Sequence, residues 1–229
     1  SEYYFPLFEE VLNKYQLPYE LRYLPIIESA LNPIARSRVG AAGLWQFMPA
    51  TGKLYGLEIN SLVDERMDPI RATDAACRFL SNLYKIYGDW NLVIAAYNCG
   101  GGNVNKAIRR AGGKRDFWSI YPFLPRETRN YVPIFIAANY AMNYGHEHGI
   151  CKAPIEKTML TDTICISQRM HLQQVSEKLE ISMDELRRLN PQYSRDILPG
   201  GKDYTLCLPT EKIGLFIEQQ DSIIAHKAD

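Results

Sequence analysis

Apolar side chains recur every three or four residues through most of the first 144 positions, which is the spacing of a helix face. The first such stretch, residues 7–15, ends at Pro18, and Pro25 either kinks a second stretch over residues 19–31 or opens its second half. Prolines that start helices and glycines that stop them bound the later stretches. The pattern predicts further helices over residues 69–87, 90–98, 103–111 and 125–144.

Two glycine-rich segments lie between these helices, at residues 36–43 and 98–103. Long glycine loops between well-bounded helices lose much conformational entropy when they become ordered. We therefore expect the backbone of both segments to approach a ligand closely.

The pattern changes after residue 154. Residues 163–167 and 204–209 alternate as strands do, and two short helical stretches lie between them. The second of these begins at Ser182, with Glu185 three residues later, which is a capping box. The sequence predicts an α+β protein: a mainly helical domain over residues 1–150, a linker over 151–161, a small strand–helix–helix–strand domain over 162–212 and a C-terminal tail over 213–229.

Composition and charge exclude several classes of protein. The chain is 46% apolar and 23% charged, as ordinary globular domains are. Its apolar runs are far shorter than the roughly 18 residues of a membrane span. Residues 1–150 hold 16 basic and 14 acidic side chains and the remainder holds 10 and 12, so neither half has the basic excess of a nucleic-acid-binding protein. The five cysteines form no paired zinc motif, and we predict no metal and no cofactor.

Glu28 is the first candidate for chemistry. It lies near the end of an apolar helix beside Ile26, Ile27 and Leu31, and an apolar surrounding raises the pKa of a carboxyl group. Such a group can donate a proton at neutral pH. A simple exposed helix glutamate is the alternative on this evidence alone.

Four motifs follow one another in register: E-S-x-x-N-P from Glu28, G-A-x-G-L-x-Q-x-M-P from Gly40, A-Y-N-x-G from Ala96 and E-T-x-x-Y-V from Glu127. Together they resemble the catalytic domain of the family 1, soluble-type lytic transglycosylases. Many members have methionine at the position of Trp45. With tryptophan there, the second motif resembles that of the membrane-bound murein lytic transglycosylase D subgroup.

The resemblance implies a goose-lysozyme-like fold and cleavage of the β-1,4 bond between N-acetylmuramic acid and N-acetylglucosamine in peptidoglycan. Members cleave without water and leave a 1,6-anhydro ring on the muramic sugar. The resemblance makes Glu28 the single catalytic acid and base. The residues that it places in substrate binding are Ser37, Gln46, Met48, Tyr97, Asn98, Glu127 and Tyr131.

Several of these residues have a purely structural alternative. Tyr97 and Trp45 suit a core, Met48 suits a gap in a core, and Asn98 suits the end of a helix.

Two functions other than that of a lytic transglycosylase also remain open. A lysozyme-type hydrolase would need a second carboxylate to activate water, and the loop with Asp64, Glu65 and Asp68 could supply one. The other function is that of a glycan-binding scaffold without catalytic activity.

The small domain resembles a LysM domain, which binds glycans containing N-acetylglucosamine. Residues 183–191 and 197–209 carry the resemblance, whereas Ser167–His171 replaces the G-D-T turn of the glycan groove. Glycan binding and a packing or spacing role therefore both stay open for this domain. Cys165 and Cys207 fall on its two strands, and we predict a disulfide between them.

Partners and location follow from the resemblance. We expect peptidoglycan strands as the partner, no nucleic acid and a monomer. The expected location is the periplasm or the outer-membrane-associated envelope. The chain starts at Ser1 without a leader, so it is expected to be a mature or trimmed form, with any signal segment or lipid anchor outside it.

Overall fold

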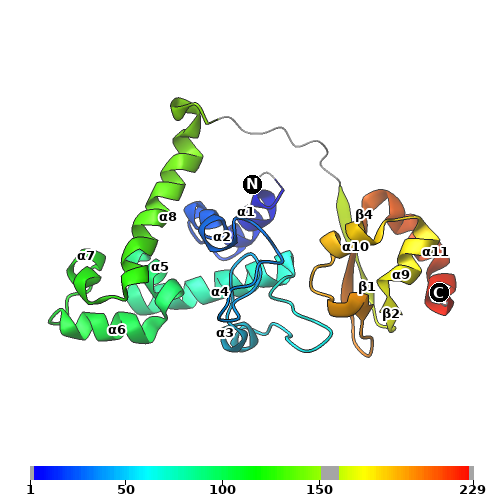
Figure 1. Ribbon diagram of the computed structural model, residues 1–229, viewed down its shortest axis with the longest axis horizontal. Helices are drawn as coiled ribbons and strands as arrows, with labels where there is room; N and C mark the ends of the chain where they lie inside the picture. The colour runs from blue at the N-terminus through cyan, green and yellow to red at the C-terminus, as the bar shows by residue number, and fades with distance from the viewer. Residues whose placement is uncertain (1–2, 151–159, 227–229) are drawn as a thin grey trace. The chain divides into compact units, whose positions relative to one another are not determined.

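The structure is a computed structural model that describes residues 3–150 and 160–226. Most of these residues are helical, and four short strands form two small sheets (Figure 1). The α+β fold class is confirmed. The chain divides into two compact units, Ser1–Asn32 with Thr73–Pro154 and Pro33–Ala72 with Ile155–Asp229.

The first unit is all helical. Helix α5 packs on α6 and α8, and α2 packs on α8. Its elements are α1 (Phe5–Lys14), the 3-10 helix η1 (Tyr19–Tyr23), α2 (Leu24–Ser29), most of α4 (Pro69–Tyr87), α5 (Trp90–Cys99), α6 (Gly101–Arg110), α7 (Phe117–Ile120), η2 (Tyr121–Phe123), α8 (Arg126–Tyr144) and η3 (Gly145–His148).

Prolines and glycines set most of these helix ends where the sequence predicts them. Pro25 lies in the first turn of α2, so the stretch over residues 19–31 divides into η1 and α2. Gly88 follows α4 with a φ of +67°, and Asp89 caps α5 by accepting from the backbone N–H of Leu92.

The loop expected at residues 98–103 is almost absent, and that expectation is wrong. Gly100 alone separates α5 from α6, and its φ of +81° lets the chain turn within one residue. Gly101 already belongs to α6 and lies close to Tyr87, since a Cβ on Gly101 would be 2.9 Å from the phenol oxygen. The glycines therefore serve a tight helix–helix corner.

In the second unit, residues 33–72 form turns, the short helix α3 (Pro49–Leu54) and the first four residues of α4. Ala42 and Phe47 pair as an antiparallel bridge, with a hydrogen bond of 3.1 Å in each direction between their backbone groups. The bridge closes a tight turn over residues 43–46.

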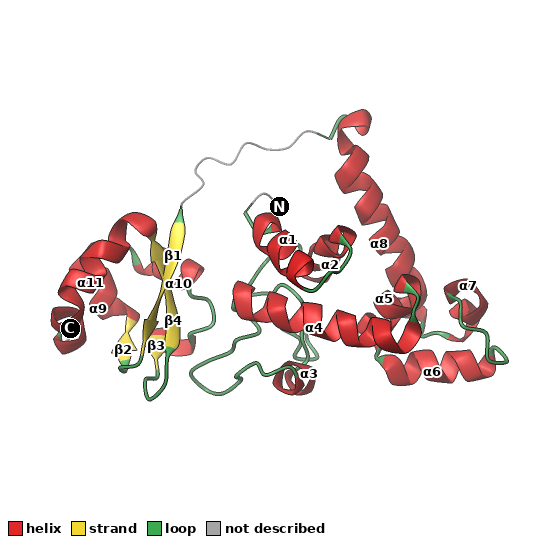
Figure 2. Ribbon diagram, turned by 180° about the vertical axis from the view of Figure 1, so that it is seen from behind, coloured by secondary structure: helices red, strands yellow, loops and turns green. Residues whose placement is uncertain are grey.

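The rest of this unit is a βααβ module. β1 (Thr161–Ile166) pairs antiparallel with β4 (Tyr204–Pro209), and β2 (Met170–His171) pairs with β3 (Ile197–Leu198). Helices α9 (Leu172–Leu179) and α10 (Met183–Leu189) lie between them in the chain (Figure 2). The capping box expected at Ser182 is present in part, because the Ser182 hydroxyl accepts from the backbone N–H of Glu185.

The module continues beyond residue 212, where we expected a tail to begin. Helix α11 (Thr210–Ala225) packs on α9, β1 and β4, and its Phe216 and Ile223 are fully buried in the module's core. Burying two large apolar side chains stabilises the module by roughly 3–6 kcal/mol. Residues 213–225 are therefore part of the module, whereas 227–229 lie outside the described residues, as do 151–159 of the expected linker.

The predicted disulfide between Cys165 and Cys207 is wrong, because both thiols are free. The strand register explains this. Cys207 lies opposite Thr163 and Cys165 lies opposite Thr205, so the two cysteines are diagonal neighbours. Diagonal Cα atoms lie roughly 7–8 Å apart, beyond the usual reach of a disulfide.

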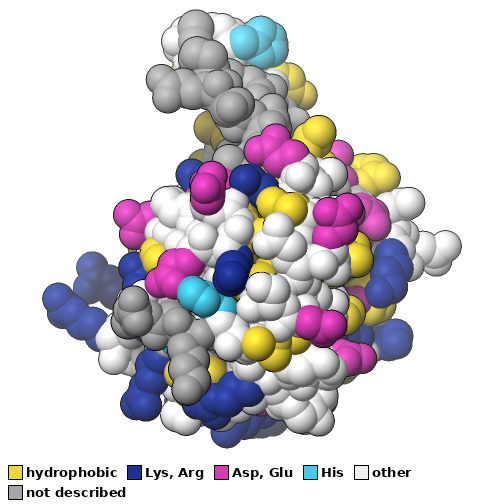
Figure 3. All heavy atoms as spheres, turned by 90° about the vertical axis from the view of Figure 1, so that its right-hand side faces the viewer, with side chains coloured by type: hydrophobic (Ala, Val, Ile, Leu, Met, Phe, Trp, Pro, Cys, Tyr) yellow, Lys and Arg dark blue, Asp and Glu magenta, His cyan; other side chains and the backbone are white. Residues whose placement is uncertain are grey.

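The face in Figure 3, where the module is exposed, carries both acidic and basic side chains across it. Within residues 3–150 and 160–226, no helix combines the length and the apolar character needed to cross a bilayer.

Candidate active site

Glu28 lies in the last turn of α2, between an apolar helix and the left-handed residues Ala30 and Leu31, whose φ values are +51° and +61°. The short helix ends there, and its last side chains face α8, against which α2 packs. Glu28 is half-buried. The alternative of a simple exposed glutamate is therefore wrong.

Tyr131 on α8 contacts Glu28 directly. Its phenol O–H donates a short hydrogen bond to Oε1 of Glu28. The pKa of Glu28 is raised to about 7. Burial raises it most, the hydrogen bond from Tyr131 lowers it, and the charge of nearby Glu127 raises it. Burial is the largest of the three effects, so the protonated form of Glu28 is available at neutral pH.

Two tyrosines keep their protons beside this carboxyl. Burial raises the pKa of Tyr97 well above 10, and the negative charge of Glu28 raises it further. Burial and the same charge raise the pKa of Tyr131. Tyr97 also packs on Phe79, with ring centroids 5.3 Å apart, so it is partly a packing residue as well.

The end of α5 is tied to the start of α8. The buried Thr128 hydroxyl donates to Oδ1 of Asn98 at 2.8 Å. Glu127, one residue before Thr128, is exposed and close enough to raise the pKa of Glu28. The first unit therefore brings together five of the predicted site residues, namely Glu28, Tyr97, Asn98, Glu127 and Tyr131.

Ser37 and Gln46 lie on turns of residues 33–72. The Ser37 hydroxyl accepts from the backbone N–H of Ala41 at 3.0 Å. Gln46 has a φ of +48°, and its Nε2 donates to the carbonyls of Ala35 at 3.2 Å and Gly43 at 2.8 Å. Its amide is thus held by the turn's own backbone.

The core alternative is wrong for Met48 and right for Trp45. Met48 precedes α3 with 43% of its surface exposed, so it does not fill a core. Trp45 is fully buried, which makes it a core residue and leaves no ring face for a sugar.

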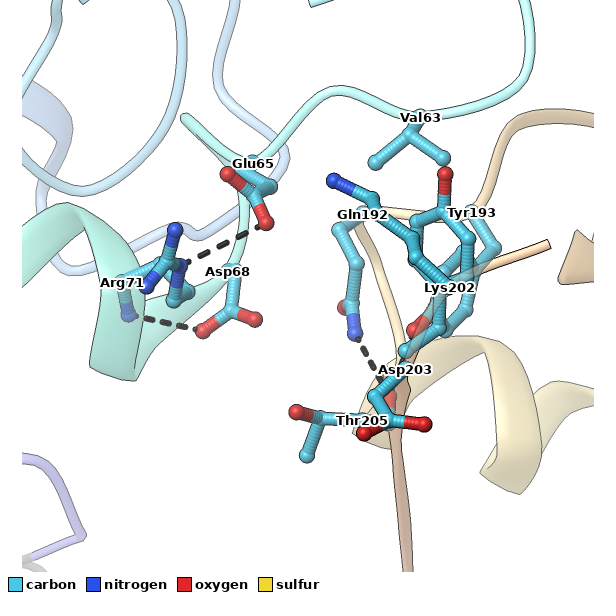
Figure 4. Close-up of a pocket in the computed structure, with 10 residues that line it drawn as sticks. Val63, Glu65, Asp68, Arg71, Gln192, Tyr193, Lys202, Asp203 and Thr205 are labelled. Atoms are coloured by element: carbon cyan, nitrogen blue, oxygen red, sulfur yellow. Dashed lines mark hydrogen bonds and ion pairs between the residues drawn. The ribbon is translucent and has the colours of Figure 1, made fainter. Parts of the chain in front are cut away.

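The three carboxylates that could serve a hydrolase are all engaged within the second unit. Asp64 pairs with Arg66. Glu65 lies 3.4 Å from Arg71, and Asp68 accepts from the backbone N–H groups of Ile70 and Arg71 at the start of α4; Figure 4 shows both carboxylates beside Arg71. Asp64 is buried, and Glu65 also accepts from the backbone N–H of Glu58 at 2.7 Å. Each carboxylate therefore has a structural partner within the second unit.

No group of three or more His, Cys, Asp or Glu side chains among residues 3–150 and 160–226 is placed to hold a metal ion.

Sequence reasoning missed two groups of positioning residues. The first is Thr128, which holds Asn98. Its position inside the fourth motif, E-T-x-x-Y-V, was the one feature of the sequence that could have indicated this role. The Asp64–Arg66 pair, which holds the turns with Ser37 and Gln46, had no signal in the periodicity.

Comparison with known proteins gives the family. Residues 6–119 match the Transglycosylase SLT domain, and residues 160–225 match the LysM-like domain of lytic transglycosylase MltD. The chain belongs to the SLT lytic transglycosylase family. Its C-terminal module is the MltD-type LysM-like domain, and the resemblance stated from the motifs is confirmed.

Named relatives agree with this assignment. The chain is 37% identical over 183 residues to the membrane-bound lytic murein transglycosylase D of Escherichia coli K12, an alignment that covers 78% of this chain and 40% of that protein. It is 32% identical over 123 residues to the soluble lytic murein transglycosylase of the same organism, covering 51% and 19%. The chain thus spans less than half of the length of these relatives.

Solved structures support the lysozyme-like fold. The soluble lytic transglycosylase SLT70 of E. coli matches with a TM-score of 0.52 and 28% identity, over 62% of this chain and 24% of that one. The 70-kDa soluble lytic transglycosylase in complex with bulgecin A matches with a TM-score of 0.53 at the same identity, over 62% and 24%.

Proposed function

We propose that this chain is a lytic transglycosylase that cleaves the β-1,4 bond between N-acetylmuramic acid and N-acetylglucosamine in peptidoglycan, with Glu28 as its only acid and base. One observation carries the proposal: Glu28 is half-buried against Tyr131, with a pKa raised to about 7. A carboxyl with a pKa near the working pH can both give and take a proton.

The proton balance needs only this group. Protonated Glu28 gives its proton to the glycosidic oxygen, and the bond from that oxygen to the muramic sugar breaks. The carboxylate then removes the proton from the 6-hydroxyl of the same sugar, whose oxygen attacks the anomeric carbon and closes the 1,6-anhydro ring. Glu28 ends protonated again, and no water is consumed.

The neighbouring residues support a cationic transition state. The N-acetyl oxygen of the substrate stabilises the anomeric carbon in the intermediate, as in substrate-assisted glycosidases. Tyr97 lies close enough to Glu28 to feel its charge, and Thr128 holds Asn98 in the same unit. We assign the orientation of the N-acetyl group to Tyr97, Asn98 and Gln46. Ser37, Met48, Glu127 and Tyr131 complete the proposed sugar-binding set.

A hydrolase is disfavoured because Asp64, Glu65 and Asp68 are all engaged by other groups, and an inverting glycosidase needs a free base to activate water.

The proposed place of action is the cell envelope, where peptidoglycan lies. The proposed partner is the glycan strand, and we propose that the chain acts as a monomer.

The test is mass spectrometry of fragments released from purified peptidoglycan by the wild type, Glu28→Gln and a matched control, Glu10→Gln, which changes an exposed carboxylate on α1 outside the proposed site. We expect anhydromuramic ends, lighter by one water than hydrolysed ends, from the wild type and the control, and none from Glu28→Gln. Near-normal release by Glu28→Gln would refute the role of Glu28, and hydrolysed ends from the wild type would refute the transglycosylase.

A further inference from the structure

Residues 57–68 and the LysM-like module share a seam within the second unit. Val63 pairs with Tyr193 as an antiparallel bridge. On either side of it, the Asp64 N–H donates to the carbonyl of Gln192 at 2.9 Å, and the Ser194 N–H donates to the carbonyl of Leu62 at 2.8 Å. The seam is therefore a short piece of β-pairing between segments more than a hundred residues apart in sequence.

Side chains from both segments reinforce the seam. Val63 is fully buried and belongs to the module's own apolar core, and Figure 4 shows it beside Tyr193. Glu58 pairs with Lys202 at 2.6 Å and accepts from the Tyr204 hydroxyl at 3.2 Å. A polar cavity of about 170 Å³ lies along the seam and is lined from both sides.

Asp64 connects the seam to the turns. While its N–H bonds the module, its carboxylate accepts from Nε and Nη2 of Arg66, each at 2.8 Å, and both side chains are at most 5% exposed. Nη1 of Arg66 donates to the carbonyl of Gly40 at 2.7 Å and to that of Phe47 at 3.0 Å. One guanidinium thus holds two turns at once.

Those turns carry two of the proposed substrate residues. Gly40 lies in the turn that begins at Ser37, and Phe47 directly follows Gln46. Val63, the neighbour of Asp64, is buried in the module's core, and the Asp64 N–H bonds the carbonyl of Gln192. Docking of the module therefore holds in place the backbone that carries this ion pair.

We propose that the LysM-like module positions the turns of Ser37 and Gln46 through Val63 and the Asp64–Arg66 pair. The module is then a structural support for substrate binding, whatever its own affinity for glycan. Asp64 and Arg66 are positioning residues, not catalytic ones. The link to substrate rests on the proposed function, whereas the link between module and turns does not.

The test uses the full chain with Val63→Asp, which places a charge in the apolar seam. The module keeps its other buried core residues, so it can undock and stay folded. Leu54→Asp is the matched control, because Leu54 belongs to the same segment and is 80% exposed. Hydrogen exchange of the backbone amides is measured over residues 36–47, over the module and over α8.

We expect exchange over residues 36–47 to quicken by at least about tenfold in Val63→Asp, with α8 and the module's strands unchanged and Leu54→Asp like the wild type. If the module's own amides lose protection, Tyr204→Phe with Lys202→Met supplies a milder break of the seam, and a smaller rise over residues 36–47 is expected. Unchanged exchange over residues 36–47 in both variants would overturn the proposal.

Undocking itself is followed by placing a protease site within residues 151–159 of the full chain. After cleavage, the wild-type fragments should stay together on size-exclusion chromatography, and those of Val63→Asp should separate. Co-elution of the Val63→Asp fragments, together with unchanged exchange over residues 36–47, would also overturn the proposal.

Kinetics separate this inference from the proposed function. On peptidoglycan, we expect Val63→Asp to lower kcat/KM by about tenfold, mainly by raising KM, with the pH profile set by Glu28 unchanged. If Glu28→Gln kept its activity, the proposed function would fail while the exchange result could still stand. A loss in kcat alone, or a shifted pH profile, would contradict a positioning role.

Discussion

The phenol of Tyr131 donates a hydrogen bond to the carboxyl of Glu28 across 103 positions of sequence. The bond stabilises the ionised carboxylate, while burial of the same group favours the protonated form. The balance of these two effects leaves the pKa of Glu28 at about 7 and makes both protonation states available.

Tyr131→Phe should raise the pKa of Glu28 further, because it removes the donor that favours the ionised form. The alkaline limb of the profile of kcat/KM against pH should move to higher pH, and the maximal rate should fall by roughly ten- to a hundredfold because the carboxylate loses its orientation. Tyr144→Phe, on the same helix with an exposed ring, is the control. An unmoved alkaline limb in Tyr131→Phe would contradict this account of Glu28.

Glu28→Gln should stabilise the protein at alkaline pH. The pKa of Glu28 is about 7 in the folded state against an ordinary value of 4.5, so its stabilising effect is complete below pH 4.5 and is lost as the pH rises through 7. Gln cannot ionise and does not lose that stability. The difference in Tm between variant and wild type should grow from pH 4.5 to about 7 and then level off. A difference that shrank over this range would disprove the raised pKa.

Thr128→Val should release Asn98. The change keeps the shape of a buried side chain but removes the hydroxyl that donates to Asn98 at 2.8 Å, at a cost of about 1 kcal/mol in the free energy of unfolding. We expect KM to rise several-fold. Thr128→Ser keeps the hydroxyl and should restore KM. Equal KM values in the two variants would show that the hydrogen bond does not position Asn98.

Gly43→Ala and Gly40→Ala form a matched pair. Both glycines have positive φ, +83° and +91°, so each substitution carries a backbone cost of about 1–2 kcal/mol. A Cβ on Gly43 would also lie 1.7 Å from the carbonyl oxygen of Arg66, whereas nothing lies within 4 Å of one on Gly40. Thermal unfolding should show the far larger loss of Tm for Gly43→Ala. Similar losses would mean that the close approach to Arg66 is not maintained.

Local chemistry accounts for what the sequence predicts well. Pro25, Gly88 and the N-cap at Ser182 act on the backbone within a few residues, so the ends of their helices could be predicted. Glu28 could be proposed as the acid because its apolar neighbours lie in the same helix. Its contact with Tyr131 is long-range and was not predicted, because the motifs indicated only that both residues belong to one site.

What the sequence did not predict depends on tertiary contacts. The helix that ends in Ala225 was expected to be a tail, because Phe216 and Ile223 show their role only when β1 and β4 are beside them. Asp64 was considered only as a source of a water-activating base, and its buried pairing with Arg66 was not predicted. The prediction of a disulfide between Cys165 and Cys207 was wrong because the register of two strands cannot be predicted from the alternation of their side chains alone.

The central claim is that one carboxyl, Glu28, cleaves the glycan without water. Digestion of purified peptidoglycan in heavy-oxygen water, followed by mass spectrometry of the products at early times, tests it most directly. The account predicts anhydromuramic ends that carry no heavy oxygen, released by the wild type and not by Glu28→Gln. Reducing muramic ends that carry solvent oxygen would contradict it and would make the protein a hydrolase.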